Sequence, residues 1–458
     1  MTTSQERGMW GSRLGFILAA AGSAVGLGNI WGFPTRVGQG GGAVFVVIYL
    51  FCIVLICAPI LVAEFVLGRG SRQSPVGAFK YFSSGTRWWW VGALGVVTSV
   101  AIVAFYSVIG GWTIGYVWYS ATGALSSGGE GAGDFFTQFT GNGFKGVFCT
   151  FLFLGLAAAS NIGGVRTGIE RVAKTLMPAL LLLLVLLAVR SLTLPGAAEG
   201  LAYYMRPDLS QAFNMSVFGA ALGQAFFSLS LGNGAMLTYG SYLRRSEGIG
   251  RVVLWVVLLD TFIALLAGLI IFPAGFSIAG FDPASTGPGL IFAVLPELFA
   301  TLVGGRLFGG AFFVLLVIAA LTSAISLLEV PVAHVIDRRQ WSRPKAVLVV
   351  SGSAFLLSIP CALGFGAVGS LTDFVPAQWG GNFLGLVATL CNNFSLPIGG
   401  MLIAIFVGYV WRVDRAVAEL LAEHAWFPAP RLWGLLIRYV SPLGISIILV
   451  ISMLAVIM

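Results

Sequence analysis

The hydrophobic positions of this chain form long, nearly unbroken runs that short polar clusters separate. A helix needs about 20 mostly apolar residues to cross the hydrocarbon core of a bilayer. Eleven segments meet this requirement, so we predict an all-α polytopic membrane protein with about 11 transmembrane helices in a single domain, residues 1–458. The predicted helices cover residues 13–37, 42–68, 88–122, 143–162, 170–193, 213–242, 251–277, 307–337, 345–366, 383–411 and 434–457.

The composition excludes the water-soluble classes of protein. The chain is 58% hydrophobic and only 9% charged, whereas soluble domains carry about 25% charged residues. So few charges cannot cover a surface that faces water, which excludes a soluble enzyme, a secreted disulfide scaffold and a disordered chain. The 62 glycines and 13 tryptophans are typical of bilayer helices and of their interfacial ends.

The net charge of +8 reflects membrane topology. If the N-terminus is cytoplasmic, 20 of the 25 Lys and Arg residues fall on the cytoplasmic side of the predicted helices. This asymmetry follows the positive-inside rule, and eleven helices then place the C-terminus outside. The basic balance therefore indicates a lipid bilayer as the partner and gives no reason to expect a nucleic acid.

Two of the predicted helices contain polar, glycine-rich breaks near their midpoints. The first helix contains the break at residues 22–29 and the sixth the break at residues 227–234. A broken helix at bilayer depth is tolerated only where its freed backbone groups are buried in protein or line a cavity. Breaks five helices apart predict two inverted five-helix repeats, about 10–193 and 213–411, followed by an extra helix at about 434–457, with a binding site at the breaks. Close packing of small residues is the alternative interpretation.

Four further residues carry polar groups at bilayer depth. Asp260 lies in an otherwise apolar helix, and an intramembrane carboxylate is functional by default; it either binds a cation or is a structural carboxylate paired within the bundle. We expect Glu64 to accept hydrogen bonds from unwound backbone. Taken alone, Thr322 and Ser323 are typical of hydroxyls that bond back to their own helix.

Four segments carry a family resemblance. Residues 10–31, 223–232, 258–261 and 320–323 resemble signatures of the neurotransmitter:sodium symporter family, and the likeness to its bacterial amino-acid members extends over essentially the whole chain. The resemblance implies a sodium-coupled symporter, not an enzyme, that takes up an amino acid by alternating access across the bacterial cytoplasmic (inner) membrane. A proton-coupled amino-acid or osmolyte carrier and, from another class, an ion channel are the alternatives.

The resemblance also implies two sodium sites. The first takes the carbonyl of Ala24 and the side chains of Asn29, Ser228 and Asp260, completed by the substrate carboxylate. The second takes the carbonyls of Gly22, Val25 and Ala319 with the hydroxyls of Thr322 and Ser323. Asp260 stands where the leucine-transporting bacterial member has a neutral ligand, so we expect its fixed charge to make bound chloride unnecessary.

Gly26 indicates the class of substrate. Monoamine members of the family carry an aspartate here, whereas glycine leaves room for a substrate that supplies its own carboxylate, which favours an α-amino acid. The implied substrate-binding residues are Ser23, Ala24, Gly26, Gly28, Ile102, Tyr106, Phe227, Ser228, Ser230, Asn233, Ser323 and Leu327. Asn233 replaces an aromatic residue of the leucine-transporting member, so we expect a polar substrate tip or a water to satisfy its amide.

The resemblance implies unequal gates. The inner gate pairs Arg7 with Asp337 near Trp10 and Tyr242, and we expect Glu329 to join this network. The family's outer ion pair falls on Gly32 and Ala388, which leaves outer closure to aromatic residues. Arg36 either replaces the missing arginine or is an interfacial arginine that snorkels. We expect a monomer or a weak homo-oligomer.

Overall fold

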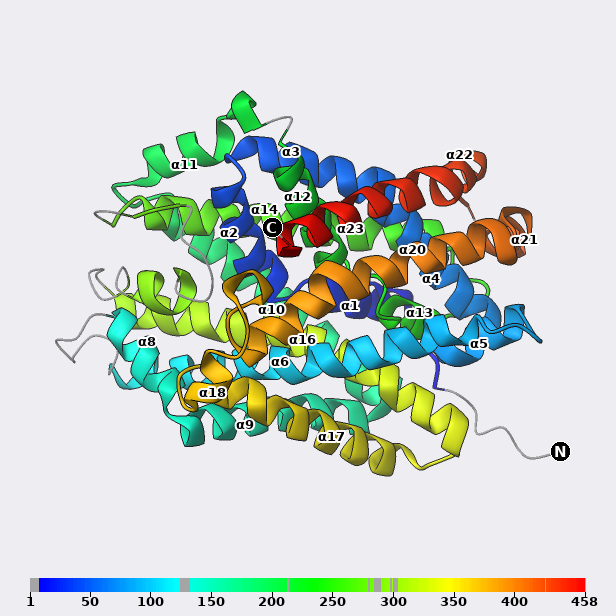
Figure 1. Ribbon diagram of the computed structural model, residues 1–458, viewed down its shortest axis with the longest axis horizontal. Coiled ribbons are helices and arrows are strands. Elements are labelled where there is room, and N and C mark those ends of the chain that lie inside the picture. Colours follow the sequence, from blue (N-terminus) through cyan, green and yellow to red (C-terminus); the bar gives the residue numbers. More distant parts are fainter. Residues whose placement is uncertain are drawn as a thin grey trace.

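The computed structural model describes residues 8–123, 132–211, 214–278, 281–283, 290–296, 299, 304–424 and 426–457. Within these ranges the chain is helical, and the only β pairing is one isolated bridge between Gly42 and Pro207. Most of the long helices run along the horizontal axis of Figure 1 and pack side by side as one bundle. The predicted all-α membrane fold is therefore confirmed.

Every predicted span coincides with helix. Within the described residues, nine helices are long and apolar enough to cross a membrane, and a bent pair makes a tenth. The spans are α1 (Arg13–Ala24) with η1 (Gly28–Gly32) and α2 (Phe33–Gln39); α3 (Ala43–Cys52) with η2 (Ile53–Cys57) and α4 (Ala58–Ser71); α6 (Trp89–Thr122); α9 (Gly143–Ile162); η3 (Val165–Ile169) with α10 (Glu170–Ser191); α14 (Ile249–Gly275); α16 (Gly305–Arg339); α17 (Arg343–Leu363); α19 (Phe383–Thr389) with η7 (Leu390–Ser395), α20 (Leu396–Ile405) and η8 (Phe406–Val410); and α22 (Pro430–Leu435) with η10 (Leu436–Val440) and α23 (Ser441–Ile457). The predicted sixth span consists of α12 (Met215–Ser228) and the short α13 (Ala235–Gly240).

Shorter elements connect the spans. They are α5 (Pro75–Phe82), α8 (Ala132–Gly141), α11 (Ala197–Met205), η4 (Leu209–Gln211), η5 (Leu290–Val294), α18 (Gly369–Thr372), η6 (Ala377–Trp379), α21 (Val413–Leu420) and η9 (Ala422–His424). In Figure 1, α8, α11 and α18 lie at one end of the bundle, and α5 and α21 lie at the other.

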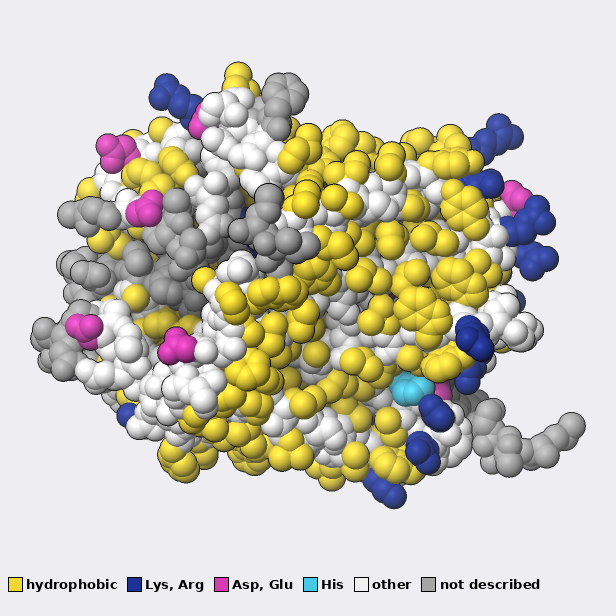
Figure 2. Space-filling view, viewed as in Figure 1, with side chains coloured by type: hydrophobic (Ala, Val, Ile, Leu, Met, Phe, Trp, Pro, Cys, Tyr) yellow, Lys and Arg dark blue, Asp and Glu magenta, His cyan; other side chains and the backbone are white. Residues whose placement is uncertain are grey.

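The two ends of the bundle differ in charge. Figure 2 shows Lys and Arg side chains gathered at the right-hand end, Asp and Glu side chains mostly at the opposite end, and a broad apolar surface between them. We call the end that carries Arg69, Arg245, Arg343 and Arg415 the basic end, and the end that carries Asp134, Glu199, Asp208 and Asp373 the acidic end. This pattern fits an apolar belt in lipid between two wet ends.

Both glycine-rich segments break their helices, as predicted. The first span bends by 50° between α1 and the helix that begins at Gly28. In the sixth span, α12 ends at Ser228 and α13 begins at Ala235. Between them Ser230 and Gly232 have positive φ angles of 51° and 80°, so the chain there cannot continue an α-helix. The repeat boundaries at about 10–193 and 213–411 stay a prediction.

Candidate functional site

Glu64 from α4 holds the break in the sixth span. Its Oε1 accepts a hydrogen bond from the Gly232 amide at 2.7 Å, and its Oε2 accepts one from the Leu237 amide at 3.2 Å. Both amides lack the helical partners that an unbroken span would give them. Gly232 has no room for a side chain, because a Cβ would overlap the carbonyl oxygen of Leu396. The expected role of Glu64 as a support for unwound backbone is confirmed.

Asp260 lies beside both breaks and is fully buried. Its Oδ1 accepts a hydrogen bond from Asn29 Nδ2 at 2.7 Å, and the Ser228 hydroxyl lies 2.8 and 2.9 Å from its two carboxylate oxygens. The Tyr49 hydroxyl donates in turn to Ser228 at 3.2 Å. Among the described residues, no Lys, Arg or His forms an ion pair with Asp260. The structure thus places a carboxylate without a basic partner between the first, sixth and seventh spans.

A second group of oxygens surrounds Ser323 of α16. Its Oγ lies 3.3, 3.2 and 3.1 Å from the carbonyl oxygens of Gly22, Ser23 and Val25, where the first span begins to unwind. One hydroxyl proton cannot satisfy three carbonyls, so the cluster has more acceptors than donors. Thr322 instead bonds back to the carbonyls of Ile318 and Ala319 in its own helix. The two hydroxyls therefore differ in their present partners.

A small cavity lies between the two breaks. Its volume is about 20 Å³, enough for roughly one water. The cavity is lined by Ser23, Ala24, Gly26, Gly28, Ile102, Tyr106, Phe227, Ser230, Asn233, Ser323, Leu327 and Leu396. The first eleven of these are among the twelve residues that the family resemblance implied. The remaining implied residue, Ser228, does not line the cavity and bonds to Asp260 instead. Leu396 lines the cavity but was not among the implied residues.

Gly26 shapes this cavity by its missing side chain. A Cβ at this position would stand 2.6 Å from Ser323 Oγ and 2.7 Å from the Tyr106 hydroxyl oxygen. That tyrosine hydroxyl accepts a hydrogen bond from the Leu27 amide at 3.0 Å. Ser230 Oγ donates to the Ser23 carbonyl at 2.9 Å and so links the two breaks directly.

The side chain of Asn233 makes a hydrogen bond within the chain as well as lining the cavity. Its Oδ1 accepts a hydrogen bond at 2.8 Å from the amide of Ala235, the first residue of α13, whose N-cap is Gly234. Only its amide nitrogen remains without a hydrogen bond among the described residues, and the side chain lines the cavity. The side-chain oxygen of Asn233 is therefore used by the backbone at the start of α13, and the polar contribution of this side chain to the cavity is a donor.

A vestibule of about 530 Å³ lies outside the cavity, toward the acidic end, and the two share Gly28, Tyr106 and Phe227. Gly32 and Ala388, where the family places its outer ion pair, both line this vestibule. Arg36 also lines it and donates to the Ala220 carbonyl at 3.3 Å. The snorkelling interpretation of Arg36 is wrong, because α2 turns this side chain toward the vestibule instead of the lipid interface.

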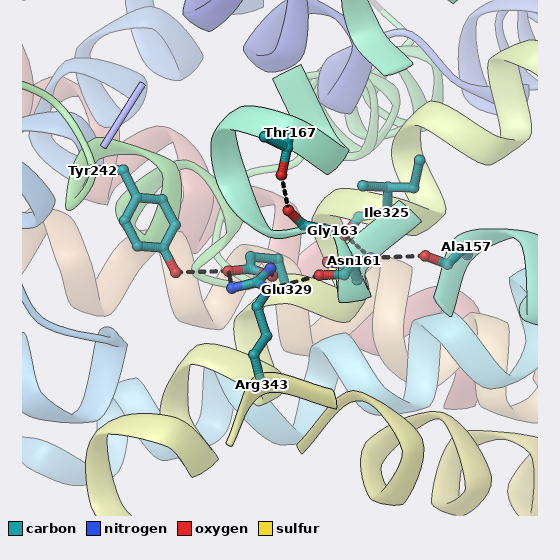
Figure 3. A network of polar contacts seen from close by, with 8 residues as sticks. All are labelled: Ala157, Asn161, Gly163, Thr167, Tyr242, Ile325, Glu329 and Arg343. Carbon is teal, nitrogen blue, oxygen red and sulfur yellow. Dashed lines mark hydrogen bonds and ion pairs between the residues drawn. The ribbon is translucent and has the colours of Figure 1, made fainter. Parts of the chain in front are cut away.

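A polar network closes the basic end (Figure 3). Glu329 is fully buried in α16 and accepts hydrogen bonds from the Tyr242 hydroxyl at 2.7 Å and from the Arg343 guanidinium at 2.5 and 3.1 Å. Arg343 also donates to the carbonyl of Asn161 at 2.6 Å. The network thus joins the fourth, sixth, eighth and ninth spans, and Arg343 is a member that the sequence patterns did not indicate.

The other expected members of the inner gate are only partly placed. Arg7 lies outside the described residues. Asp337 Oδ2 accepts a hydrogen bond from the Ser74 amide at 2.8 Å. Trp10 packs edge-on against Tyr239 and Tyr242, and its indole nitrogen donates to the Tyr239 carbonyl at 3.1 Å.

Sequence comparison places this geometry among transporters. The chain matches the sodium:neurotransmitter symporter family over residues 7–129 and 145–457. It is 37% identical to the uncharacterized sodium-dependent transporter YhdH of Bacillus subtilis, over 97% of this chain and 98% of that protein. It is 28% identical to the sodium-dependent serotonin transporter of Drosophila melanogaster, over 98% of this chain and 77% of that protein.

Comparison of structures agrees. The crystal structure of MhsT in complex with L-phenylalanine matches with a TM-score of 0.89 and 43% identity, over 98% of this chain and 100% of that one. The family expected from the sequence motifs is therefore confirmed, and it is a family of transporters and not of enzymes. On the matched length, the broken helices and the fold, this chain belongs to the sodium:neurotransmitter symporter family.

Proposed function

We propose that the protein couples inward sodium flow to the uptake of an α-amino acid across the bacterial inner membrane. Asp260 carries this proposal. It is a fully buried carboxylate, it has no basic partner among the described residues, and it contacts Asn29 of the first span and Ser228 of the sixth beside their breaks. A buried charge is stable only when it is paired, and a hard cation bound by side-chain and carbonyl oxygens supplies the missing partner.

Two groups of oxygens support two sodium ions. Ala24, Asn29, Ser228 and Asp260 form the first proposed site, which the substrate carboxylate completes. The second proposed site uses Gly22, Val25, Ala319, Thr322 and Ser323, where acceptors already outnumber donors. To join it, the Thr322 hydroxyl turns from its own helix toward the ion. In the first site Asn29 rotates, because its amide nitrogen now faces Asp260.

The cavity lining favours a neutral α-amino acid. No charged side chain lies among the described residues that line it. A cationic amine would therefore lack a counter-ion, whereas a zwitterion brings its own carboxylate to the sodium and to the amides near Gly28. Ile102, Leu327 and Leu396 offer an apolar surface to the substrate side chain, and the Asn233 amide nitrogen offers one donor. The relative solved with L-phenylalanine supports the same class.

The two closed barriers support alternating access. Tyr106 and Phe227 separate the vestibule from the cavity, and the Glu329 network with Trp10 closes the basic end. Opening one barrier while the other stays closed moves the cavity from one side of the membrane to the other. We place the basic end, with the N-terminus, in the cytoplasm, because Lys and Arg concentrate on cytoplasmic loops. The C-terminus is then outside.

Uptake by purified protein in proteoliposomes tests the proposal. Radiolabelled neutral amino acids are added under an inward sodium gradient, with potassium replacing sodium as the control and chloride replaced by gluconate. We expect uptake that needs sodium and proceeds without chloride, because the charge of Asp260 occupies the place of an anion. Uptake that follows an imposed pH gradient in the absence of sodium would instead establish a proton-coupled carrier.

A matched pair of variants tests whether Asp260 binds the coupled sodium ion. Asp260→Ala removes the carboxylate and should abolish sodium-dependent binding. Thr261→Ala, on the next residue of α14, removes a buried hydroxyl that has no hydrogen-bond partner within the described part of the chain, so it should leave binding intact. Equal losses in both variants would refute the assignment of sodium binding to Asp260.

A further inference from the structure

Glu170, at the first position of α10, holds the start of α1. Its carboxylate Oε2 accepts a hydrogen bond from the Gly11 amide at 2.6 Å. Its Oε1 accepts hydrogen bonds from the Ser12 hydroxyl at 2.8 Å and from Lys174 Nζ at 2.6 Å. The Glu170 side chain is only 2% exposed, although it lies at the basic end of the bundle. One carboxylate of the fifth span therefore ties down the segment that leads into the first.

The sequence of α1 leaves room for this carboxylate. A Cβ on Gly15 would overlap the Glu170 carboxylate, and a Cβ on Gly11 would stand 3.2 Å from its Oε2 and 2.9 Å from Arg166 Nε. Two glycines, one on each side of the Ser12 cap, thus allow the approach. A larger side chain at position 15 would displace Glu170, and one at position 11 would crowd both Glu170 and Arg166.

The contact also matches the electrostatics of a helix start. Ser12 is the N-cap of α1, and its Oγ accepts a hydrogen bond from the Gly15 amide at 3.1 Å. A negative charge near the first turn of a helix is stabilising, because the free amides there carry partial positive charge. Glu170 supplies this charge from a different span, so the stabilisation exists only while α1 lies against α10.

The helix α1 is short and is set off from the rest of its span by the break. It has 12 residues, it ends at the break after Ala24, and the chain bends by 50° before the next helix. Ser23 and Ala24 at its end line the cavity. A departure of α1 from α10 would uncover the cavity from the basic end and would have to break every contact of Glu170 with Gly11 and Ser12.

We propose that Glu170 is a latch for α1 that stabilises the state closed at the basic end, in addition to the Glu329–Arg343 pair. The role of the latch in transport rests on the proposed function, but the contact between Glu170 and α1 exists in the chain without ligands. Because the second proposed sodium site takes the carbonyl of Gly22 in α1 and that of Val25 at its C-cap, the latch and sodium favour the same position of this helix. Loss of the latch therefore weakens apparent sodium affinity through linkage.

Hydrogen–deuterium exchange of the amides in residues 13–24 tests the latch in potassium buffer without substrate. We expect Glu170→Gln to speed this exchange by about tenfold, the effect of losing one charge-assisted hydrogen bond. Lys174→Gln is the matched control: it removes the neighbouring cation but leaves the hydrogen bonds from Gly11 and Ser12, so its effect should be smaller. Unchanged exchange in Glu170→Gln would overturn the proposal, and so would an equal increase throughout the protein.

A double substitution separates a latch from general support. Gly15→Ala should speed exchange as Glu170→Gln does, because its Cβ displaces the carboxylate. Glu170→Ala should do the same, and Gly15→Ala combined with Glu170→Ala should add nothing to Glu170→Ala alone, since the space is then free. Additive effects of the two changes would refute the proposed contact. If Glu170→Gln does not fold, Gly15→Ala carries the same test.

Sodium titration distinguishes this proposal from the transport function. In the unmodified protein sodium should slow exchange of residues 13–24, and Glu170→Gln should need about tenfold more sodium for half of that effect. A latch that responds to Glu170→Gln while sodium has no effect in either protein would uphold the latch and refute sodium coupling. Sodium protection that is the same in both proteins would uphold sodium binding and refute the latch.

Discussion

Replacing Gly26 by alanine is the sharpest perturbation of the proposed site. The added Cβ would stand 2.6 Å from Ser323 Oγ and 2.7 Å from the Tyr106 hydroxyl oxygen, whereas ordinary contact begins at 3.4 Å. Each oxygen must therefore withdraw by about three quarters of an ångström, or the backbone must shift. Ser323 then leaves the carbonyls of Gly22 and Val25, and Tyr106 leaves the Leu27 amide.

The expected loss follows from these contacts. Two hydrogen bonds at about 0.5–1.5 kcal/mol each give about 1–3 kcal/mol, which is about a 5- to 150-fold weaker affinity for sodium and substrate. Equilibrium binding of a radiolabelled amino acid to purified protein, titrated with sodium, measures this change. Gly223→Ala is the control, because a Cβ there meets nothing within 4 Å although the residue lies in the nearby α12. Affinity that stays within twofold in Gly26→Ala would refute the proposed roles of both oxygens.

Three other substitutions test separate parts of the site. Arg343→Ala leaves the buried Glu329 with Tyr242 as its remaining side-chain partner among the described residues and should lower the free energy of unfolding by about 3–5 kcal/mol. Glu329→Gln combined with Arg343→Gln should lower it less in thermal unfolding, and an equal loss would contradict a charged pair. Asp260→Asn removes the fixed charge and should make sodium-driven uptake depend on chloride. Uptake by this variant in gluconate medium, without chloride, would contradict the prediction. Asn233→Asp keeps an oxygen for the Ala235 amide but places a charge in the cavity. The melting temperature should therefore stay the same, while the affinity for apolar amino acids should fall by about tenfold. Unchanged affinity would show that Asn233 does not contact the substrate.

The parts of the fold that depend on local pattern could be predicted from the sequence. Lipid leaves few ways to satisfy a backbone, so a long apolar run has to be a helix, and all eleven runs are helical. The same constraint predicted breaks around Gly26 and Gly232, because helix-breaking residues at bilayer depth are tolerated only where the freed backbone groups are buried in protein or line a cavity. Glu64 was predictable too, since a lone carboxylate near unwound backbone has free amides to bind.

Contacts between distant segments were harder to predict. Arg343 fits the positive-inside pattern so well that nothing distinguishes it from the other cytoplasmic arginines, yet it turns inward to Glu329. Leu396 is one apolar residue among many in its span, and only the packing of α20 places it at the cavity. The bond from the Ala235 amide to Asn233 Oδ1 could have been predicted, because Asn side chains commonly accept from the backbone two residues further along the chain.

The bond between Glu64 and the unwound part of the sixth span bears on how the protein is made. Without that carboxylate, the amides of Gly232 and Leu237 would meet lipid on insertion, at several kcal/mol for each unsatisfied group. The ribosome delivers the second span well before the sixth, so the acceptor is already in the bilayer when the donors arrive. The break in the sixth span can therefore complete these hydrogen bonds only once the second span, which carries the acceptor, is in place.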